Sequence, residues 1–380
     1  MNTVTVPGTA VLPTYARQDV TFVSGEGAWL VDAEGGRYLD FLAGIAVVGL
    51  GHCHPAPLAA AEAQLRKLWH TSNLYWTEPM QLLAERLSER FGGARPFFCN
   101  SGGEAIEAAI KWARRITGRP GIVALHDSFH GRTLGALSVT GQPAKRTAFE
   151  PLVPGVSFVA LNDSGALAAA VGPETALILL EPIQGEGGVH PASAEFLAAA
   201  RALADRHGAL LVLDEVQAGM GRTGTFFAWE QLGVRPDALT LAKGLANGLP
   251  IGCLLVSDSA PAGFEPGDHA STFGGNPVVC AAACAVCDAL TPELLAEVGR
   301  RGEQLARGLA KLPGVLEVRG RGLLLAGELD RPVSPVIDAA REHGLLVGSA
   351  GERTLRLTPP LVVTSAEVER ALTILEEVLA

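Results

Sequence analysis

The stretch that decides the fold runs from Leu210 to Gly248 and reads LLVLDEVQAGMGRTGTFFAWEQLGVRPDALTLAKGLANG. It contains two short apolar runs, 210–213 and 238–241, that have the length and the flanking turn residues of buried strands. Asp214 follows the first run, and Lys243 lies just beyond the second. Because open α/β sheets bind ligands at the carboxyl ends of their strands, we expect both charges at one crevice.

A lysine and an acid at a buried crevice need a chemical explanation, because an isolated charge is costly to bury. Lys243 could be condensed with an aldehyde as a Schiff base, while Asp214 faces a protonated pyridine nitrogen. A single cofactor, pyridoxal phosphate, would then account for both charges. The alternative at this stage is that both residues are strand-end charges facing water.

Length and composition bound the class of protein. A chain of 380 residues with 48% hydrophobic residues can bury a large core, which predicts two or three globular domains. No apolar run is long enough to span a membrane, and the first residues resemble no signal peptide, so we expect a cytoplasmic protein without a membrane partner. The net charge of -10, without a basic cluster, argues against nucleic acid as a partner.

The six cysteines are scattered along the chain, which indicates reduced thiols. Cys280, Cys284 and Cys287 come closest to the spacing of a zinc site. They lie in the alanine-rich run VVCAAACAVCDAL, where cysteine is typical of small buried helix positions. We therefore expect no metal site.

Strand and helix patterns alternate from Pro96 to Cys253, which predicts an α/β fold with a mainly parallel sheet and crossover helices. Ser101 and Glu104 have capping-box spacing, so a helix should begin at Ser101 with Gly102 and Gly103 in its first turn. The backbone N–H groups of such a helix start can bind a phosphate. The alternative is an ordinary capped helix whose glycines allow close packing.

Two further loops carry candidate ligand-binding residues. In SFHGRT, Phe129 offers an aromatic face and Arg132 a cation, although a solvated arginine would also fit the pattern. In EPIQGEGG, Glu181 and Glu186 follow a predicted strand over 176–180. These two acids are expected at the same edge of the sheet as Asp214.

We expect four parts along the chain, of which the last is a smaller α+β domain. They are an N-terminal arm with strands that pack on the small domain (1–50), a large cofactor-binding domain (51–260), an interdomain turn and helix (261–290) and the C-terminal small domain (291–380).

A dinucleotide-binding dehydrogenase is an alternative interpretation. Residues 219–224 fit the pattern G-x-G-x-x-G, and Asp237 lies at the distance expected for a ribose-binding acid. In that fold, however, the first glycine follows its strand directly, whereas DEVQA intervenes here. The segment TFFAWEQLG also makes a poor crossover helix, so the pattern match is weak.

Motifs along nearly the whole chain together resemble one family. GHCHP, HTSNLYWTEP, NSGGEA, SFHGRT, EPIQGEGGV, DEVQAGMGRTG, LAKGLANGLPIG, STFGGNP and LRLTPPLV occur in this order. In this order they make the chain similar to the class III aminotransferases of pyridoxal-phosphate fold type I, and among them to the acetylornithine aminotransferases. One departure is Gly103, where that family commonly has Thr or Ala after NSG.

The resemblance implies roles for the residues around the cofactor ring. Lys243 would hold pyridoxal 5'-phosphate and, once displaced, act as the base, while Asp214 would pair with the pyridine nitrogen. Gln217 would approach the phenolic oxygen, and Phe129 would stack on the ring. The ring could then accept the electrons left when a proton departs from the amine-bearing carbon.

The resemblance also implies a homodimer with shared active sites. The backbone at Gly102 and Gly103 would seat the phosphate together with Thr272 of the partner subunit. Arg132 would hold the substrate carboxylate, with Ser271 nearby.

The implied reaction is transfer of the terminal amino group of N-acetylornithine to 2-oxoglutarate in arginine biosynthesis. One substrate reacts at its terminal amine and the other next to a carboxylate, so one cation is needed in only one half-reaction. Arg356 is the candidate for that cation, and Glu186 would neutralise it in the other half-reaction.

Other donors within the fold remain open: ornithine, succinylornithine, a carrier-bound lysine precursor or 4-aminobutyrate. An aminomutase of the same fold is a further alternative, and a catalytically silent binding protein is the alternative from a different class.

Overall fold

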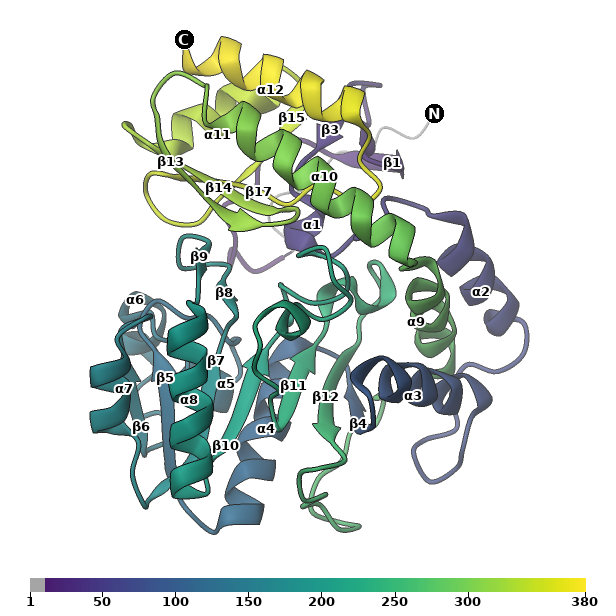
Figure 1. Ribbon diagram of the computed structural model, residues 1–380. Coiled ribbons are helices and arrows are strands. Elements are labelled where there is room, and N and C mark those ends of the chain that lie inside the picture. The colour runs from purple at the N-terminus through teal and green to yellow at the C-terminus, as the bar shows by residue number, and fades with distance from the viewer. Residues whose placement is uncertain (1–10) are drawn as a thin grey trace.

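The computed structural model describes residues 11–380, and a seven-stranded sheet lies at its centre (Figure 1). The strand order is β4-β12-β11-β10-β7-β5-β6, in which β12 runs antiparallel to β11 and β4. The other paired neighbours run parallel, so the expected mainly parallel sheet is confirmed. The strands are β4 (Ala94–Cys99), β5 (Gly121–Leu125), β6 (Val156–Val159), β7 (Thr175–Leu180), β10 (Leu210–Asp214), β11 (Ala238–Leu241) and β12 (Gly252–Ser257).

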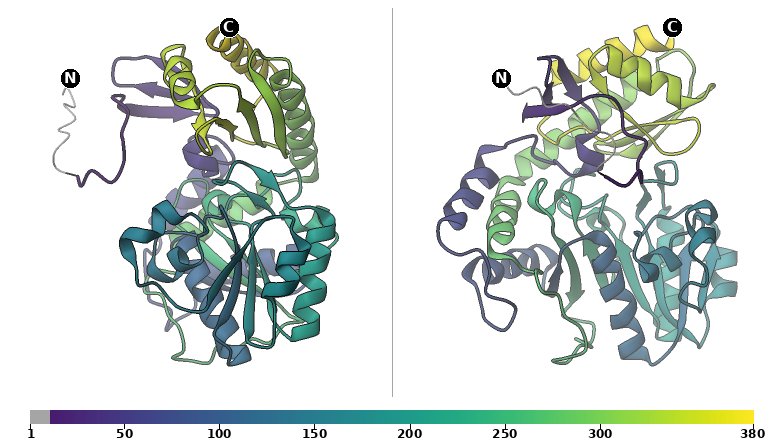
Figure 2. Two further views of the ribbon diagram at one scale, coloured as in Figure 1. Left: turned by 90° about the vertical axis from the view of Figure 1, so that its left-hand side faces the viewer. Right: turned by 180° about the vertical axis from the view of Figure 1, so that it is seen from behind.

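Helices cover both faces of this sheet, as the opposite views in Figures 1 and 2 show. On one face lies α4 (Gly102–Thr117), and on the other lie α7 (Ser164–Ala170) and α8 (Ala194–His207). In β5, Ile122 packs with the α4 side and Val123 with the α8 side. Burial on both faces explains why these strands are continuous apolar runs without alternating polar residues.

The small domain combines a second sheet with three helices (Figure 1). Its strand order is β13-β14-β17-β16, and α10 and α11 pack on α12. The elements are α10 (Pro292–Leu309), β13 (Val315–Arg321), β14 (Leu324–Leu329), α11 (Val333–Glu342), β16 (Gly348–Ser349), β17 (Thr354–Leu357) and α12 (Ser365–Leu379).

A four-stranded sheet joins the N-terminal strands to this C-terminal part, because β3 pairs in parallel with β15. It contains β1 (Phe22–Glu26), β2 (Trp29–Asp32), β3 (Arg37–Asp40) and β15 (Leu345–Leu346). Figure 2 shows the N-terminal strands beside the small domain. Residues 1–10 of the expected N-terminal arm lie outside the described residues.

Three further helices pack together beside β4 and β12 (Figure 1). They are α2 (Pro55–Leu65), α3 (Glu78–Phe91) and α9 (Pro277–Ala289). α2 begins at Pro55, because the side chain of His54 caps the helix by accepting the N–H of Ala56 and Pro55 fits the first turn. In α9, the three closely spaced cysteines are buried, as expected for small helix positions.

The remaining short elements lie mostly in connections at the upper edge of the central sheet. They are α1 (Ala43–Ala46), α5 (Leu134–Ser138), α6 (Pro143–Arg146), η1 (Thr147–Phe149), β8 (Ile183–Gln184), β9 (His190–Pro191), η2 (Ala228–Gln231) and η3 (Lys243–Ala246). No single helix among residues 11–380 is long and apolar enough to cross a membrane. The pair α9 and α10 reaches that length and composition only together and is bent by 73°.

The structure excludes the dinucleotide-binding alternative. After β10, residues 219–224 form turns, and a single 3-10 turn, η2, follows where a crossover helix would be required. Asp237 pairs with Arg201 at 2.9 Å and accepts the N–H of Leu211, so it fixes the start of β10.

Candidate active site

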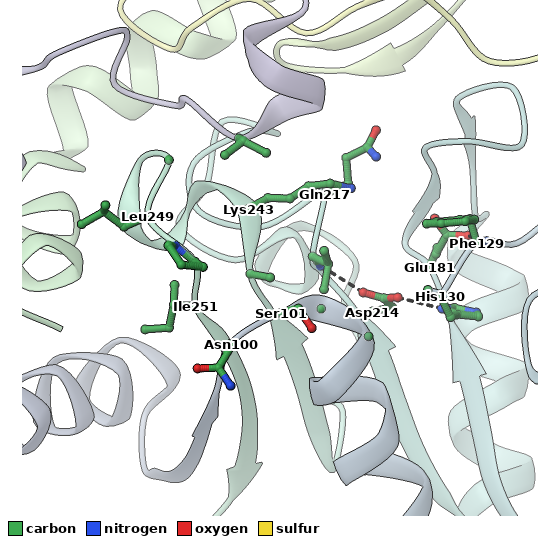
Figure 3. A pocket seen from close by; sticks show the side chains of 18 residues that line it. Asn100, Ser101, Phe129, His130, Glu181, Asp214, Gln217, Lys243, Leu249 and Ile251 are labelled. Atoms are coloured by element: carbon green, nitrogen blue, oxygen red, sulfur yellow. Dashed lines mark hydrogen bonds and ion pairs between the residues drawn. The ribbon is translucent and has the colours of Figure 1, made fainter. Parts of the chain in front are cut away.

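A cavity of about 310 Å³ lies where β10 and β11 end (Figure 3). It is lined by six of the residues predicted for the site: Gly102, Gly103, Phe129, Asp214, Gln217 and Lys243. Four separate segments contribute them: the start of α4, the loop after β5, the end of β10 with its following turn, and the start of η3. The parallel sheet has thus brought together segments that are distant in sequence.

Asp214 is the last residue of β10 and is held by three hydrogen bonds. Figure 3 draws the one to His130. Its Oδ1 accepts from the N–H of Val216 at 3.0 Å and from Oγ1 of Thr240 at 2.9 Å. Its Oδ2 lies 2.7 Å from Nδ1 of His130. The buried carboxylate is therefore fixed in one orientation before any ligand binds.

His130 follows Phe129 in the same loop, and its side chain is fully buried against Asp214. Burial lowers the pKa of His130, but the hydrogen bond and charge of Asp214 outweigh burial, so the net shift is upward. Its Nε2 is buried and forms no hydrogen bond within the described part of the chain. The imidazole therefore serves the Asp214 carboxylate rather than a further protein group.

Lys243 begins η3 directly after β11, on the strand that pairs with β10. Its φ of +40° is unusual for a residue with a side chain, which indicates a locally strained backbone. Burial lowers the pKa of Lys243, and the nearby carboxylates of Glu186 and Asp214 only partly oppose it. A lower pKa makes the neutral amine accessible, which is the form that attacks a carbonyl carbon or removes a proton.

The start of α4 presents backbone N–H groups to the same cavity. Oγ of Ser101 accepts the N–H of Glu104 at 3.2 Å, so the helix begins as expected. The predicted capping box is only half formed, because the Glu104 carboxylate accepts from the N–H of Asn100 instead. A Cβ on Gly103 would meet nothing closer than 3.7 Å, whereas one on Gly102 would lie 2.9 Å from Val216.

Phe129 lies on the cavity wall beside His130 and Glu181 (Figure 3). The Glu181 carboxylate accepts the N–H of Phe129 at 3.0 Å and that of Gly185 at 3.2 Å. Burial raises the pKa of Glu181 to about 7. Glu181 thus supports the loop that presents the Phe129 ring.

Glu186 and Arg356 form an ion pair next to the cavity. Arg356 lies in β17 of the small domain and also donates to the carbonyl of Gly185 at 3.0 Å. Burial raises the pKa of Glu186, but the charge and hydrogen bond of Arg356 lower this pKa by more than burial raises it. The net shift is therefore downward. The side chain of Gln217 contacts both members of this pair: its Nε2 donates to Oε1 of Glu186 and its Oε1 accepts from Nη1 of Arg356, each at 3.4 Å. It points away from Asp214 (Figure 3).

The other predicted residues lie outside the lining of this cavity. The Arg132 guanidinium lies 5.5 Å from the centre of the Phe129 ring, on an exposed loop. Oγ of Ser271 accepts from Nδ2 of Asn100 at 3.1 Å, close to the start of α4. Thr272 lines a separate surface groove, together with Ser271.

Comparison with protein families identifies the family to which this chain belongs. Residues 14–379 match the family described as aminotransferase class III. The chain is a class III aminotransferase. Curated relatives of this aminotransferase include the acetylornithine aminotransferase of Gloeobacter violaceus, 51% identical over 97% of this chain and 96% of the relative. That of Corynebacterium efficiens is 48% identical over 97% of this chain and 95% of the relative.

Solved structures share the fold of this class III aminotransferase. The ornithine aminotransferase of Toxoplasma gondii superposes with a TM-score of 0.93 at 34% identity, covering 98% of this chain and 92% of the other. The N-acetylornithine aminotransferase of Stenotrophomonas maltophilia superposes with a TM-score of 0.84 at 39% identity, covering 96% of both chains.

Sequence reasoning missed two polar residues of this class III aminotransferase site. His130 stands within the quoted motif SFHGRT, but its contact with Asp214 spans 84 positions. Thr240 lies within the apolar run 238–241, and β11 places it opposite Asp214 in the register. A buried polar residue within an otherwise apolar strand was the available signal for Thr240.

Proposed function

We propose that this aminotransferase moves the terminal amino group of N-acetylornithine to 2-oxoglutarate and forms N-acetylglutamate 5-semialdehyde and glutamate, as a step of arginine biosynthesis. The Glu186–Arg356 ion pair is the observation that carries the choice of a donor that reacts at its terminal amine. With Arg356 neutralised, the cavity suits a donor that has only methylenes next to its reacting carbon. The acetylornithine aminotransferases that are 45–51% identical over nearly the whole chain support the same substrate.

The cavity fits pyridoxal 5'-phosphate. Lys243 would hold the cofactor through its amine, Asp214 would face the pyridine nitrogen, and Phe129 would lie against the ring. The N–H groups of Gly102 and Gly103 at the start of α4 would bind the phosphate. When bound, the cofactor supplies an electron sink for the carbon that carries the transferred amine.

The protein groups divide the remaining chemistry. The carboxylate of Asp214, held by His130 and Thr240, would favour the protonated form of a pyridine nitrogen placed beside it. Nζ of Lys243 removes the proton from the substrate carbon that bears the amine, and its lowered pKa suits this role. Arg132 binds the substrate carboxylate farthest from the reacting carbon.

Glu186 controls the second carboxylate subsite. While it pairs with Arg356, the site accepts the uncharged methylenes of N-acetylornithine. When Glu186 swings aside, Arg356 is available for the α-carboxylate of glutamate or 2-oxoglutarate. The pair therefore serves two substrates of different charge with one cavity.

We propose a homodimer in which Thr272 acts in the cavity of the partner subunit. Large apolar side chains are exposed around the groove that holds Thr272: Trp69 at 67%, Leu74 at 86%, Tyr75 at 69%, Trp76 at 78% and Phe273 at 61%. Such a contiguous apolar surface is typical of a protein interface. Ser271 and Thr272 line the same groove as these apolar side chains, which supports their placement in the proposed interface.

The test is the visible spectrum of the purified protein on separate addition of N-acetylornithine, ornithine, 4-aminobutyrate and glutamate. Ornithine is the second candidate donor, because the ornithine aminotransferase of Toxoplasma gondii superposes on this chain with a TM-score of 0.93. Loss of the cofactor's visible band with glutamate, and at much lower concentration with N-acetylornithine than with the other donors, supports the proposal. A preference for ornithine or 4-aminobutyrate would overturn the proposed donor. A protein without a visible band would overturn the proposed cofactor.

A further inference from the structure

Lys145 lies beside the candidate active site but has no role in the chemistry described above. It belongs to the short helix α6, and its Nζ is 4.7 Å from the centre of the Phe129 ring. The Arg132 guanidinium lies 5.5 Å from the same ring. Two cations therefore border one aromatic side chain of the cavity wall.

Hydrogen bonds hold Lys145 in place relative to Phe129. The N–H of Asp127 donates to the carbonyl of Gly141, and Nε2 of Gln142 donates to the carbonyl of Asp127, each at 3.0 Å. The N–H of Lys145 then donates to the carbonyl of Gln142 at 3.0 Å. The loop with Phe129 and the helix with Lys145 thus form one unit, and the contact is built into the fold.

The two cations lack anionic partners in the part of the chain from residue 11 onward. Neither Lys145 nor Arg132 forms an ion pair with a described carboxylate. The nearby acids are engaged elsewhere, because Glu186 pairs with Arg356 and Glu181 accepts two backbone N–H groups. Lys145 is half-buried, and a half-buried charge without a counter-ion is unfavourable, so its position suits an anion supplied by a ligand.

We infer that Lys145 is a substrate-binding residue that acts with Arg132 on the carboxylate farthest from the reacting carbon. The inference rests on the proposed function, in which both substrates carry such a carboxylate. In N-acetylornithine it is the α-carboxylate, and in 2-oxoglutarate it is the γ-carboxylate. One pair of cations can therefore serve both half-reactions while the Glu186–Arg356 pair opens and closes.

Three variants of the holoenzyme test this assignment. Lys145→Met removes the charge and keeps the length of the side chain, whereas Lys145→Arg keeps the charge. Arg146→Met is the matched control, because Arg146 is the next residue of α6 and lies 4.5 Å from the Phe158 ring instead. The donors are N-acetylornithine and 4-acetamidobutylamine, which is the same molecule without its carboxylate.

Lys145→Met should raise KM for N-acetylornithine and for 2-oxoglutarate by about tenfold, with kcat changed less than about twofold. The kcat/KM for 4-acetamidobutylamine should stay at the wild-type value, because that donor has no carboxylate to bind. Lys145→Arg should restore most of the affinity, and Arg146→Met should behave like the wild type. Equal losses with both donors, or the same loss in Arg146→Met, would overturn the inference.

A binding measurement separates this inference from the proposed function. Glutarate is a five-carbon dicarboxylate that cannot react, so isothermal titration of the holoenzyme measures binding alone. Lys145→Met should weaken glutarate binding by about tenfold, and an unchanged dissociation constant would refute a role for Lys145. If the wild type does not use N-acetylornithine, the proposed donor is wrong, but the glutarate comparison still decides the role of Lys145.

Discussion

At the scale of single residues, the site depends on charges that are held by specific partners. Asp214 is oriented by His130 and Thr240, and Glu186 is paired with Arg356. Each group is buried or half-buried, where an unpaired charge is unfavourable and a well-placed partner has a large effect. Removing one partner should therefore change stability or substrate choice in a defined direction.

Replacing His130 by Phe should reduce the free energy of unfolding by about 3 kcal/mol at pH 6, because the buried Asp214 loses a charged donor. The pKa of His130 is raised above its ordinary value of 6.5 in the folded protein. The stability from this pair is therefore complete below pH 6.5 and is lost as the pH rises through the folded pKa. Urea denaturation between pH 6 and pH 9 should show the deficit of His130→Phe shrinking with pH, and a constant deficit would contradict the pairing.

Replacing Glu186 by Ala should leave Arg356 unpaired beside the cavity. The half-reaction with glutamate should then persist, while the half-reaction with N-acetylornithine slows by about tenfold, because its methylenes meet an uncompensated cation. Single-turnover stopped-flow absorbance measures each half-reaction separately. Glu317→Ala is the control, since it removes an exposed carboxylate that is paired with an arginine in β13. Equal impairment of both half-reactions would count against the gate.

At the scale of elements, helix starts were predicted best where a side chain caps the helix locally. The capping-box spacing of Thr364 and Glu367 is visible in the sequence, and the box forms at the start of α12. At α4, Ser101 caps as expected, but Glu104 turns to Asn100. The first turn of α4 then places Gly102 against Val216, in the turn after β10, and Ala242, which follows β11, so space is limited.

The two glycines of α4 should respond differently to substitution. In Gly102→Ala, the new Cβ would lie 2.9 Å from Val216, so the backbone that is proposed to bind phosphate must shift, which costs about 1–3 kcal/mol. In Gly103→Ala, the closest atom would be 3.7 Å away, in ordinary contact. Titration of the apoprotein with pyridoxal phosphate should show about tenfold weaker binding for Gly102→Ala and little change for Gly103→Ala. Equal affinities would argue against a close backbone contact.

At the scale of the whole molecule, hydrogen bonds and an ion pair join the large and small domains around the site. Nη1 of Arg222, in the turn after β10, donates to the carbonyl of Leu323 at 3.1 Å and to that of Pro359. The Arg356–Glu186 pair also crosses between the domains. The division into an arm, large domain, connecting helix and small domain remains our proposal, and the parallel pairing of β3 with β15 supports it.

The proposed dimer predicts the effect of replacing a single exposed residue. Leu74 is 86% exposed and lies in the groove with Thr272, so Leu74→Asp should place a charge in the interface and weaken dimerisation by more than about tenfold. Activity should fall together with the dimer fraction, because Thr272 is proposed to complete the partner's site. Sedimentation velocity measures the association. Leu316→Asp, at a 64% exposed position in β13, is the control. A Leu74→Asp protein that associates like the wild type would refute this interface.

The sequence by itself determined the α/β class, the strands that end at Asp214 and before Lys243, and the start of α4. These features depend on apolar periodicity and on contacts between residues a few positions apart, which are visible in the residue order. The resemblance to class III aminotransferases also came from the order of local motifs.

Only the tertiary structure decided the partners of the charged groups. The contact of Asp214 with His130 spans 84 positions, and that of Asp214 with Thr240 spans 26. Such contacts depend on how the sheets pack and on side-chain placement to within an ångström, which no local pattern encodes. The position of Lys145 beside the Phe129 ring likewise follows from the folded path of its loop and from no motif in the sequence.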